Sequence, residues 1–217
     1  RTPLTVLYGY LDLIDSENDP ELSGMVCEMR KQSTRMAQIV DDLLTLSRLD
    51  AQANTDDESI AMDAMLASLR RDAEALSQQQ HDIRVDTTSV HGIRGSANDL
   101  HSAFANLVAN AVRYTPPGGK IVVRWFDEDD GSCFEVEDSG CGIPKEHLPR
   151  ISERFYRVST SRSRDKGGTG LGLSIVKHVL GLHQARLEIR SEVGTGSIFS
   201  AHFPHARLID GTEHESA

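Results

Sequence analysis

Residues 165–174, with the sequence Asp-Lys-Gly-Gly-Thr-Gly-Leu-Gly-Leu-Ser, have the composition of a phosphate-binding loop. Glycines let a backbone approach an anion without a Cβ clash. The helix expected from about Gly172 to Gly181 presents free N–H groups and the positive end of its dipole at its start. A glycine-rich surface loop that merely precedes a helix has the same composition, so this stretch alone leaves phosphate binding open. Its candidate contacts are Gly168, Thr169, Gly170, Leu171, Gly172 and Leu173.

A second group of candidates lies on the helix expected before Pro116. Asn106 and Asn110 are four residues apart and therefore share one face of that helix. Amide oxygens suit Mg²⁺, a hard cation that keeps several waters and bridges to phosphates. Tyr114 adds an aromatic surface for a base, and Arg113 adds a positive charge for phosphate oxygens. Taken alone, paired asparagines also fit an ordinary solvated helix face.

Two further segments carry polar and aromatic residues suited to a nucleotide. Asp138 ends an expected strand, and its carboxylate can accept hydrogen bonds from an exocyclic amine such as that of adenine. Gly140 and Gly142 leave room for a flat ring, although a simple turn has the same pattern. Phe155 and Arg157 lie among basic residues and could close over a nucleotide.

The Ser/Arg/Lys run that ends at Lys166 follows these aromatic residues. It could form a flexible lid that touches phosphates, and its composition fits a disordered basic loop equally well.

Composition describes an ordinary soluble protein: 217 residues, 38 % apolar and 26 % charged. The net charge of −10 argues against general nucleic-acid binding, although it leaves room for a local basic pocket. The three scattered cysteines lack metal-ligand spacing and favour a reducing, cytoplasmic setting. We recognise no signal-peptide pattern in the first residues, and the longest apolar runs are far shorter than a membrane span. Because the chain begins without methionine and inside an expected helix, we expect a fragment of a longer protein, with any membrane segment outside it.

The first fifty residues predict two helices that form a hairpin. An apolar stripe at helical spacing covers residues 4–14, and a polar turn follows it, with Asp19 as a candidate cap. A second helix is expected over 20–49 with a coiled-coil-like seam of four heptads. Such hairpins dimerise into four-helix bundles, so we expect a homodimer; the alternative is a hairpin packed on its own chain. The seam consists of Leu22, Met25, Met29, Gln32, Met36, Ile39, Leu43 and Leu46.

The remainder predicts a second domain, an α+β sandwich with helices on one face of a mixed sheet. A polar, acidic linker at 51–58 precedes it, the domain covers 59–205, and a polar, flexible tail covers 206–217. Ser96 or Asn98 is expected to cap the helix that runs to about Tyr114. Helices are expected over 63–80 and 96–114, and strands over 59–62, 83–85, 92–94, 121–126, 133–137, 186–190 and 197–203.

The order and spacing of these clusters resemble the motif boxes of sensor histidine kinases over nearly the whole chain. The run 183–189 also resembles the phosphate-regulon sensor subgroup. The boxes are, in chain order, the end of the H box at 1–5, the N box at Asn106 and Asn110, the G1 box at Asp138, Gly140 and Gly142, the F box at Phe155, and the G2 box at 168–173.

The resemblance implies a dimerisation and histidine-phosphotransfer hairpin at 1–50, joined to a Bergerat-type ATP-binding domain. It implies ATP and Mg²⁺ as cofactors, with Asn110 on the metal, Asp138 on adenine and Asn106 among the catalytic residues. Tyr114 would pack near the base and Arg113 near the phosphates. The ATP-binding set would be Asn106, Asn110, Arg113, Tyr114, Asp138, Gly140, Gly142, Ile143, Phe155, Arg157, Lys166, Gly168, Thr169, Gly170, Leu171, Gly172 and Leu173.

The activity implied is transfer of the γ-phosphate to a hairpin histidine and then to an aspartate of a response regulator. The whole protein would be a bacterial inner-membrane sensor with this part in the cytoplasm. Thr2 would take part in response-regulator dephosphorylation. The acceptor histidine of the H box falls three residues before Arg1, so this chain as written is not expected to phosphorylate itself.

Two other functions are compatible with parts of this sequence pattern. Gyrase, chaperone and mismatch-repair ATPases share the expected fold, but they carry a water-activating glutamate where this chain has Asn106, so an ATP-driven clamp is disfavoured. The other is a nucleotide-binding dimeric scaffold without kinase activity, against which the intact boxes argue.

Overall fold

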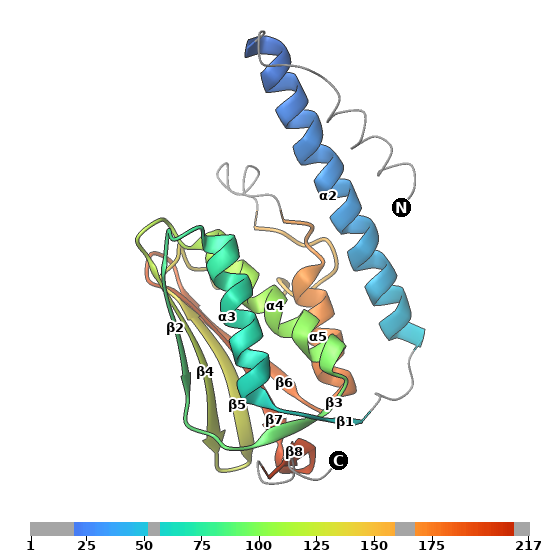
Figure 1. Ribbon diagram of the computed structural model, residues 1–217, viewed down its shortest axis with the longest axis vertical. Coiled ribbons are helices and arrows are strands. Elements are labelled where there is room, and N and C mark those ends of the chain that lie inside the picture. The colour runs from blue at the N-terminus through green and yellow to red at the C-terminus, as the bar shows by residue number, and fades with distance from the viewer. Residues whose placement is uncertain (1–19, 52–56, 159–167, 211–217) are drawn as a thin grey trace.

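The computed structural model describes residues 20–51, 57–158 and 168–210 (Figure 1). A long helix, α2 (Pro20–Ala51), lies beside a two-layered domain that contains the other described elements. The helix expected over 20–49 is therefore confirmed, with two additional residues at its end. The helix expected over 4–14 lies outside the described residues. Within the described segments, no helix combines the length and apolar character needed to cross a bilayer.

A five-stranded mixed sheet forms one layer of the domain. Its order is β2-β4-β5-β7-β6, with β2 and β4 parallel and every other neighbouring pair antiparallel. The strands are β2 (Asp82–Thr87), β4 (Lys120–Glu128), β5 (Gly131–Asp138), β6 (Arg186–Glu192) and β7 (Gly196–Pro204).

Three helices, α3 (Met62–Ser77), α4 (Ala97–Tyr114) and α5 (Gly172–Leu182), form the second layer and cover one face of the sheet (Figure 1). The expected fold class, a helical region followed by an α+β sandwich, is confirmed.

The core lies between these two layers and is centred on aromatic rings. Phe104 of α4 stacks on Phe134 of β5 with ring centroids 3.9 Å apart, and Phe203 of β7 meets Phe104 edge-on at 6.0 Å. All three side chains are almost completely buried. The opposite side of α4 remains only half-buried, which leaves Asn106 and Asn110 available to a pocket.

The α4 helix follows directly from its sequence. Leu100, Phe104, Leu107 and Ala111 recur at intervals of three and four and are all buried, as an amphipathic helix requires. Ser96 is the N-cap, as expected, and its side chain accepts a hydrogen bond from the Asp99 backbone N–H at 3.4 Å.

The prediction of a flexible tail over 206–217 is wrong for its first residues. A 3₁₀ turn, η2 (His205–Arg207), leads into β8 (Leu208–Ile209), which pairs with β3 (Gly92–Gly95). Strand β1 (Glu58–Ile60) pairs with the other edge of β3, and α2 extends to Ala51. The linker expected over 51–58 is therefore one residue too long at each end. Because Ile209 is buried against the domain, two apolar residues are enough to hold an otherwise polar segment. Residues 52–56 and 211–217 lie outside the description.

Three boundaries also differ from expectation. Helix α3 begins at Met62 and ends at Ser77 because Gln78 and Gln79 adopt left-handed conformations, with φ of 48° and 63°. The hairpin strands β4 and β5 extend until only Asp129 and Asp130 separate them, which is a much tighter turn than the expected 127–132.

The C-terminal end of α2 packs against the two-layered domain, next to α5. Leu46 and Leu49 are almost fully buried, and Arg48 forms an ion pair with the buried carboxylate of Asp99. Asp50 accepts hydrogen bonds from Arg154 at 2.9 Å and lies 3.4 Å from His178 Nδ1. Leu46, expected in a dimer seam, therefore contributes to the domain core instead.

Candidate functional site

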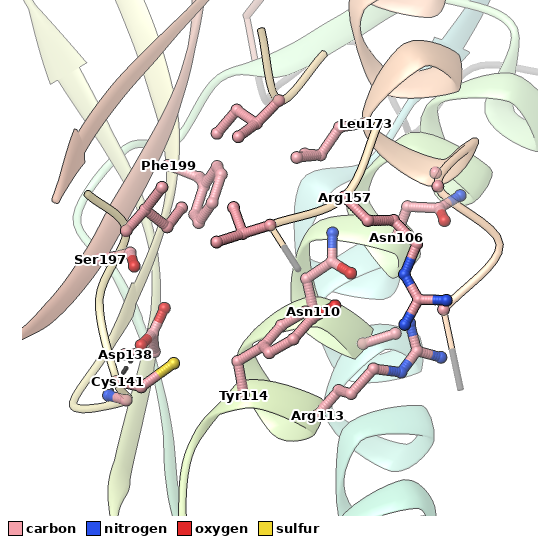
Figure 2. A pocket seen from close by; sticks show the side chains of 18 of the residues that line it. Asn106, Asn110, Arg113, Tyr114, Asp138, Cys141, Arg157, Leu173, Ser197 and Phe199 are labelled. Carbon is pink, nitrogen blue, oxygen red and sulfur yellow. Dashed lines mark hydrogen bonds between the residues drawn. The ribbon is translucent and has the colours of Figure 1, made fainter. Parts of the chain in front are cut away.

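A large cavity of about 1510 Å³ lies between α4, the ends of β5 and β7, and the loops 138–144 and 168–173. It exceeds the roughly 300–1000 Å³ typical of small-ligand sites, so it has room for a nucleotide. Figure 2 shows labelled side chains of α4 on one side and those of Asp138, Ser197 and Phe199 from the sheet on the other; Cys141, Arg157 and Leu173 come from loops and from the start of α5.

Helix α4 contributes Asn106, Asn110, Arg113 and Tyr114 to the cavity, and all four are partly buried. The Asn106 side-chain NH₂ donates to the Ser102 carbonyl at 2.9 Å, which fixes the amide orientation and leaves its oxygen directed elsewhere. Among the described residues, the Asn110 amide has no hydrogen-bond partner. A half-buried amide without a partner is free to bind a ligand or a hydrated ion.

Asp138 forms one end of the cavity, beside Ser197 and Phe199 (Figure 2). Its carboxylate is buried and accepts the Gly140 N–H at 2.8 Å, and it also accepts the Ser197 backbone N–H. Burial raises the pKa of Asp138, and these two hydrogen bonds offset the rise only in part. A buried carboxylate of this kind gains most from a further donor such as an exocyclic amine.

The opposite end of the cavity is cationic. Figure 2 shows the guanidinium groups of Arg113 and Arg157 directed toward the same region, away from Asp138. Gly168 lies beside Arg113, since a Cβ placed on it would lie 3.5 Å from Arg113 Nη1 and 3.6 Å from the Tyr114 hydroxyl. Two guanidinium groups in a cavity that a glycine backbone also lines form a suitable environment for phosphate.

The loop after Asp138 is held close to the sheet. Gly142 has φ of +67°, and a Cβ on it would lie 2.0 Å from the Glu192 carbonyl oxygen, so only glycine fits. The next residue, Ile143, donates its backbone N–H to Ser191 Oγ at 2.8 Å. Gly140, Gly142 and Ile143 thus line the cavity from a loop fixed to β6.

The segment before α5 lines the cavity through Gly168, Thr169 and Gly170, and α5 itself contributes its first two residues, Gly172 and Leu173. A Cβ on Gly172 would lie 2.4 Å from Asn106 Oδ1, so the start of α5 lies directly against the asparagine pair. The glycines of this loop therefore bring backbone, rather than side chains, to the phosphate-suited end.

Two predicted contacts do not line the cavity. The Phe155 side chain is 56 % exposed and lies outside it, although its backbone N–H donates to the Gly170 carbonyl at 2.8 Å. Leu171 is fully buried in the core beneath the loop. Both residues therefore support the loop rather than face the cavity. Lys166 and Thr2 lie outside the described residues.

Sequence reasoning missed several cavity residues. Ser197 and Phe199 come from β7, and only the register that places Ser197 opposite Asp138 brings them to the site. Gln38 and Asp42 come from α2, and Asp42 accepts a hydrogen bond from the Thr169 hydroxyl at 2.7 Å. No local pattern in the sequence signals these partners, which depend on tertiary pairing.

Residues 95–207 match the family described as histidine kinase-, DNA gyrase B- and HSP90-like ATPases, and residues 1–52 match the His Kinase A (phospho-acceptor) domain. The chain is 47 % identical over 215 residues to the phosphate regulon sensor protein PhoR of Pseudomonas aeruginosa, covering 97 % of this chain and 48 % of that protein. It is 36 % identical to PhoR of Haemophilus influenzae, covering 99 % and 51 %. The chain thus spans about half the length of these curated relatives.

Solved structures show the same architecture. Full-length ShkA in complex with AMPPNP superposes with a TM-score of 0.72 at 27 % identity, covering 94 % of this chain and 43 % of that one. The mycobacterial sensor histidine kinase MprB superposes with a TM-score of 0.60 at 26 % identity, covering 68 % and 97 %.

Proposed function

Because this chain belongs to the histidine kinase family, with a phospho-acceptor domain followed by an ATPase domain, we propose that it binds Mg²⁺-ATP as the kinase core of a two-component signalling protein. The observation that carries the proposal is the polarity of the cavity. A buried carboxylate, Asp138, lies at one end, and two guanidinium groups, those of Arg113 and Arg157, lie at the other. Adenine carries an exocyclic amine and ATP a polyanion, so each end suits one part of this ligand.

Mg²⁺ fits the donor set near the cationic end. The Asn110 amide faces the cavity without a partner among the described residues, and an amide oxygen suits this hard cation. Bound there with ATP, Mg²⁺ would neutralise charge on the phosphates. Asn106, held by Ser102, would lie beside it and position the phosphate chain together with Arg113.

The proposed reaction passes the γ-phosphoryl group to a hairpin histidine and then to an aspartate of a response regulator. This chain's residues contribute by orienting the nucleotide and by excluding water, since phosphoryl transfer depends mainly on positioning and charge neutralisation. Thr2, four residues after the family's acceptor position, is proposed to support response-regulator dephosphorylation. By the same analogy the whole protein is a bacterial inner-membrane sensor with this core in the cytoplasm.

Calorimetry with and without Mg²⁺ tests the nucleotide proposal. We expect ATP to bind with Mg²⁺-enhanced affinity, and Asn110→Ala to remove most of the enhancement while leaving Mg²⁺-free binding nearly unchanged. GTP presents a carbonyl where adenine has its amine, so Asp138 should disfavour it. Equal affinity for ATP and GTP, or no nucleotide binding, would contradict the proposed site.

Phosphotransfer is tested by incubation with labelled ATP. A protein consisting of residues 1–217 alone should form no stable phosphohistidine. A protein extended before Arg1 by a helical segment that ends in His-Glu-Leu should form phosphohistidine. The same extension with glutamine in place of that histidine is the matched control.

The role of Thr2 is tested in the extended chain. Thr2→Ala should slow dephosphorylation of the response regulator without reducing autophosphorylation; an unchanged rate of dephosphorylation would remove the role of Thr2.

Dimerisation through the hairpin is supported by an apolar stripe on α2. Met25, Met29, Met36 and Leu43 recur along the helix and are 42–55 % exposed. Unpartnered side chains of this size at heptad spacing are typical of a helix that packs against another copy. Met29→Glu together with Met36→Glu should convert a dimer to a monomer in sedimentation analysis. Exposed Glu28→Gln on the same helix should leave the dimer intact.

A further inference from the structure

A cluster of three different metal-ligand types lies on the sheet face that turns away from the helices. Cys133 of β5 and His202 of β7 are directly paired across neighbouring strands, so their side chains share one face. Phe134, next to Cys133, packs on α4, and alternation along the strand therefore directs Cys133 to the opposite face. Glu128 ends β4 close by, and one ligand atom from each of the three residues lies within 4.8 Å of the other two.

We propose that Glu128, Cys133 and His202 form a Zn²⁺-binding site on this face of the sheet, separate from the nucleotide cavity. Thiolate, imidazole and carboxylate are the three ligand types that proteins use for Zn²⁺, and a sulfur donor disfavours Mg²⁺ and Ca²⁺. The rigid pairing of β5 with β7 holds two of the ligands in fixed positions. Because Glu128 is the last residue of β4, its side chain can adjust to complete the coordination.

The imidazole of His202 is oriented as a metal ligand requires. Its Nδ1 lies 2.6 Å from Glu128 Oε2, so Nδ1 is the nitrogen that would share the ion with this carboxylate. Its Nε2, on the far side of the ring, is buried without a hydrogen-bond partner in the described part of the chain. Glu188 Oε2 on β6 lies 3.6 Å from this Nε2, where a carboxylate would help to orient the ring rather than bind the same ion. Ligand atoms about 2.0–2.1 Å from a tetrahedral ion are about 3.3 Å apart, so Glu128 and His202 need to separate by less than about 1 Å.

The charges around the thiol favour a cation. Burial raises the pKa of Cys133 to about 12, and the carboxylates of Glu128 and Glu135 add to the effect. Arg186 acts in the opposite direction, more weakly. The thiol is therefore protonated in the metal-free chain, and Zn²⁺ binding must release that proton to solvent. A divalent ion would neutralise the thiolate and one carboxylate together. The side chains of Glu128 and Glu188 are 28 % and 43 % exposed, which provides a route for the ion.

Cobalt substitution gives a direct test, because Co²⁺ bound to a thiolate absorbs strongly by charge transfer. The untagged full chain should develop this absorption with one equivalent of Co²⁺ and lose it on addition of Zn²⁺. The chain's other two cysteines, Cys27 and Cys141, are both exposed and provide matched controls. Cys27→Ser and Cys141→Ser should keep the absorption, and Cys133→Ser should abolish it. Absence of the absorption, or its persistence in Cys133→Ser, would overturn the proposal.

A thermal-shift titration with Zn²⁺ keeps the proposal testable if Cys133→Ser folds poorly. Glu128→Gln replaces a direct ligand and should weaken Zn²⁺ binding by more than the roughly 10- to 100-fold seen when a metal ligand loses only its outer carboxylate partner. Exposed Glu146→Gln is the control and should leave the titration unchanged. An equal response in both variants would show that His202 and Glu128 form only an ion pair. Because the cluster lies on the face opposite α4, ATP affinity reports separately on the proposed function.

Discussion

At the scale of single residues, the buried carboxylate of Asp138 lowers the folding stability of the nucleotide-free protein, while it is the group proposed to bind adenine. Its pKa is raised by burial, so its folded-state pKa lies above the unfolded value of about 3.9. A group of this kind contributes stability below its unfolded pKa and loses it as the pH rises through the folded pKa. At neutral pH the ionised carboxylate therefore destabilises the nucleotide-free protein.

The substitution Asp138→Asn tests this destabilising effect because it removes the charge and keeps the shape of the side chain. The amide oxygen can still accept the Gly140 N–H, so we expect a higher melting temperature than the parent at pH 7, with the difference vanishing near pH 4. ATP affinity should fall by about 10- to 150-fold, since a hydrogen bond to a charged group contributes about 1.5–3 kcal/mol. Thermal denaturation across pH, with calorimetry, measures both effects. Exposed Asp63→Asn is the control; a lower melting temperature in Asp138→Asn at pH 7 would contradict the argument.

His183 gives a prediction of the opposite sign. The ring is fully buried; Nδ1 donates to the Val179 carbonyl at 2.8 Å, and Nε2 accepts the Ser96 backbone N–H at 3.0 Å. Burial lowers the pKa of His183 below its unfolded value of about 6.5. Neutral His183 therefore contributes to folding stability above its unfolded-state pKa, and this contribution is lost as the pH falls through the pKa of His183 in the folded protein.

The parent should thus lose more unfolding free energy between pH 7 and pH 5 than His183→Gln does. Urea denaturation at both pH values checks this difference. Parallel losses in the two proteins would mean that His183 does not carry the acid sensitivity.

At the scale of elements, amphipathic segments were predictable and tertiary pairings were not. The spacing of Leu100, Phe104 and Leu107 specifies both α4 and the face it buries, so Asn106 and Asn110 could be assigned to the other face from sequence alone. Strand β8 has only two residues and depends on β3 for its hydrogen bonds, which no local pattern records. The aromatic ring of Phe155 suggested that it closes over a nucleotide. In the structure Phe155 has a positive φ of 64°, and its side chain is exposed.

The junction of loop and helix at Gly172 yields an element-scale prediction. Alanine at a helical position gains about 0.5–1 kcal/mol over glycine, whereas inserting a methyl group into a tight contact costs about 1–3 kcal/mol. The Cβ would meet Asn106 Oδ1, the end of a side chain that can rotate away. We therefore expect Gly172→Ala to change stability by no more than about 2 kcal/mol and to weaken Mg²⁺-ATP binding at least tenfold, as measured by calorimetry.

Gly181 in the same helix provides the matched control. A Cβ there meets nothing within 4 Å, so Gly181→Ala should stabilise the protein by up to about 1 kcal/mol and leave ATP binding unchanged. Equal ATP affinities in the two variants would show that the contact between Gly172 and Asn106 does not position the asparagine.

At the scale of the whole molecule, α2 forms part of the wall of the cavity proposed to bind nucleotide. Leu46 and Leu49 anchor its end in the core, and the ion pairs Arg48–Asp99 and Asp50–Arg154 hold it in register. One helix therefore carries two kinds of surface: the exposed stripe around Met29 and the buried end around Leu46. A heptad count alone assigns both to one seam, because it has no information about the second domain.

Asp42 connects α2 to the loop that is proposed to bind the phosphates of ATP. Its carboxylate is nearly buried, lines the cavity and accepts the Thr169 hydroxyl at 2.7 Å and the Gln38 amide at 2.7 Å. An anionic group held near the loop proposed to bind phosphates opposes ATP, both by repulsion and by occupying Thr169. Removing the charge alone should relieve the first effect, and removing the side chain should relieve both.

Asp42→Asn retains an oxygen that can accept from Thr169, so we expect ATP to bind several-fold more tightly, with a gain that shrinks as salt screens the charge. Asp42→Ala also frees the Thr169 hydroxyl and should bind ATP more tightly than Asp42→Asn at high salt. Calorimetry at two salt concentrations separates these contributions, with Glu28→Gln, far along the same helix, as the charge control. If α2 instead braces the cavity, Asp42→Ala will bind ATP more weakly than the parent at both salt concentrations. In that case the contact of Asp42 with Thr169 organises the loop for nucleotide rather than competing with it.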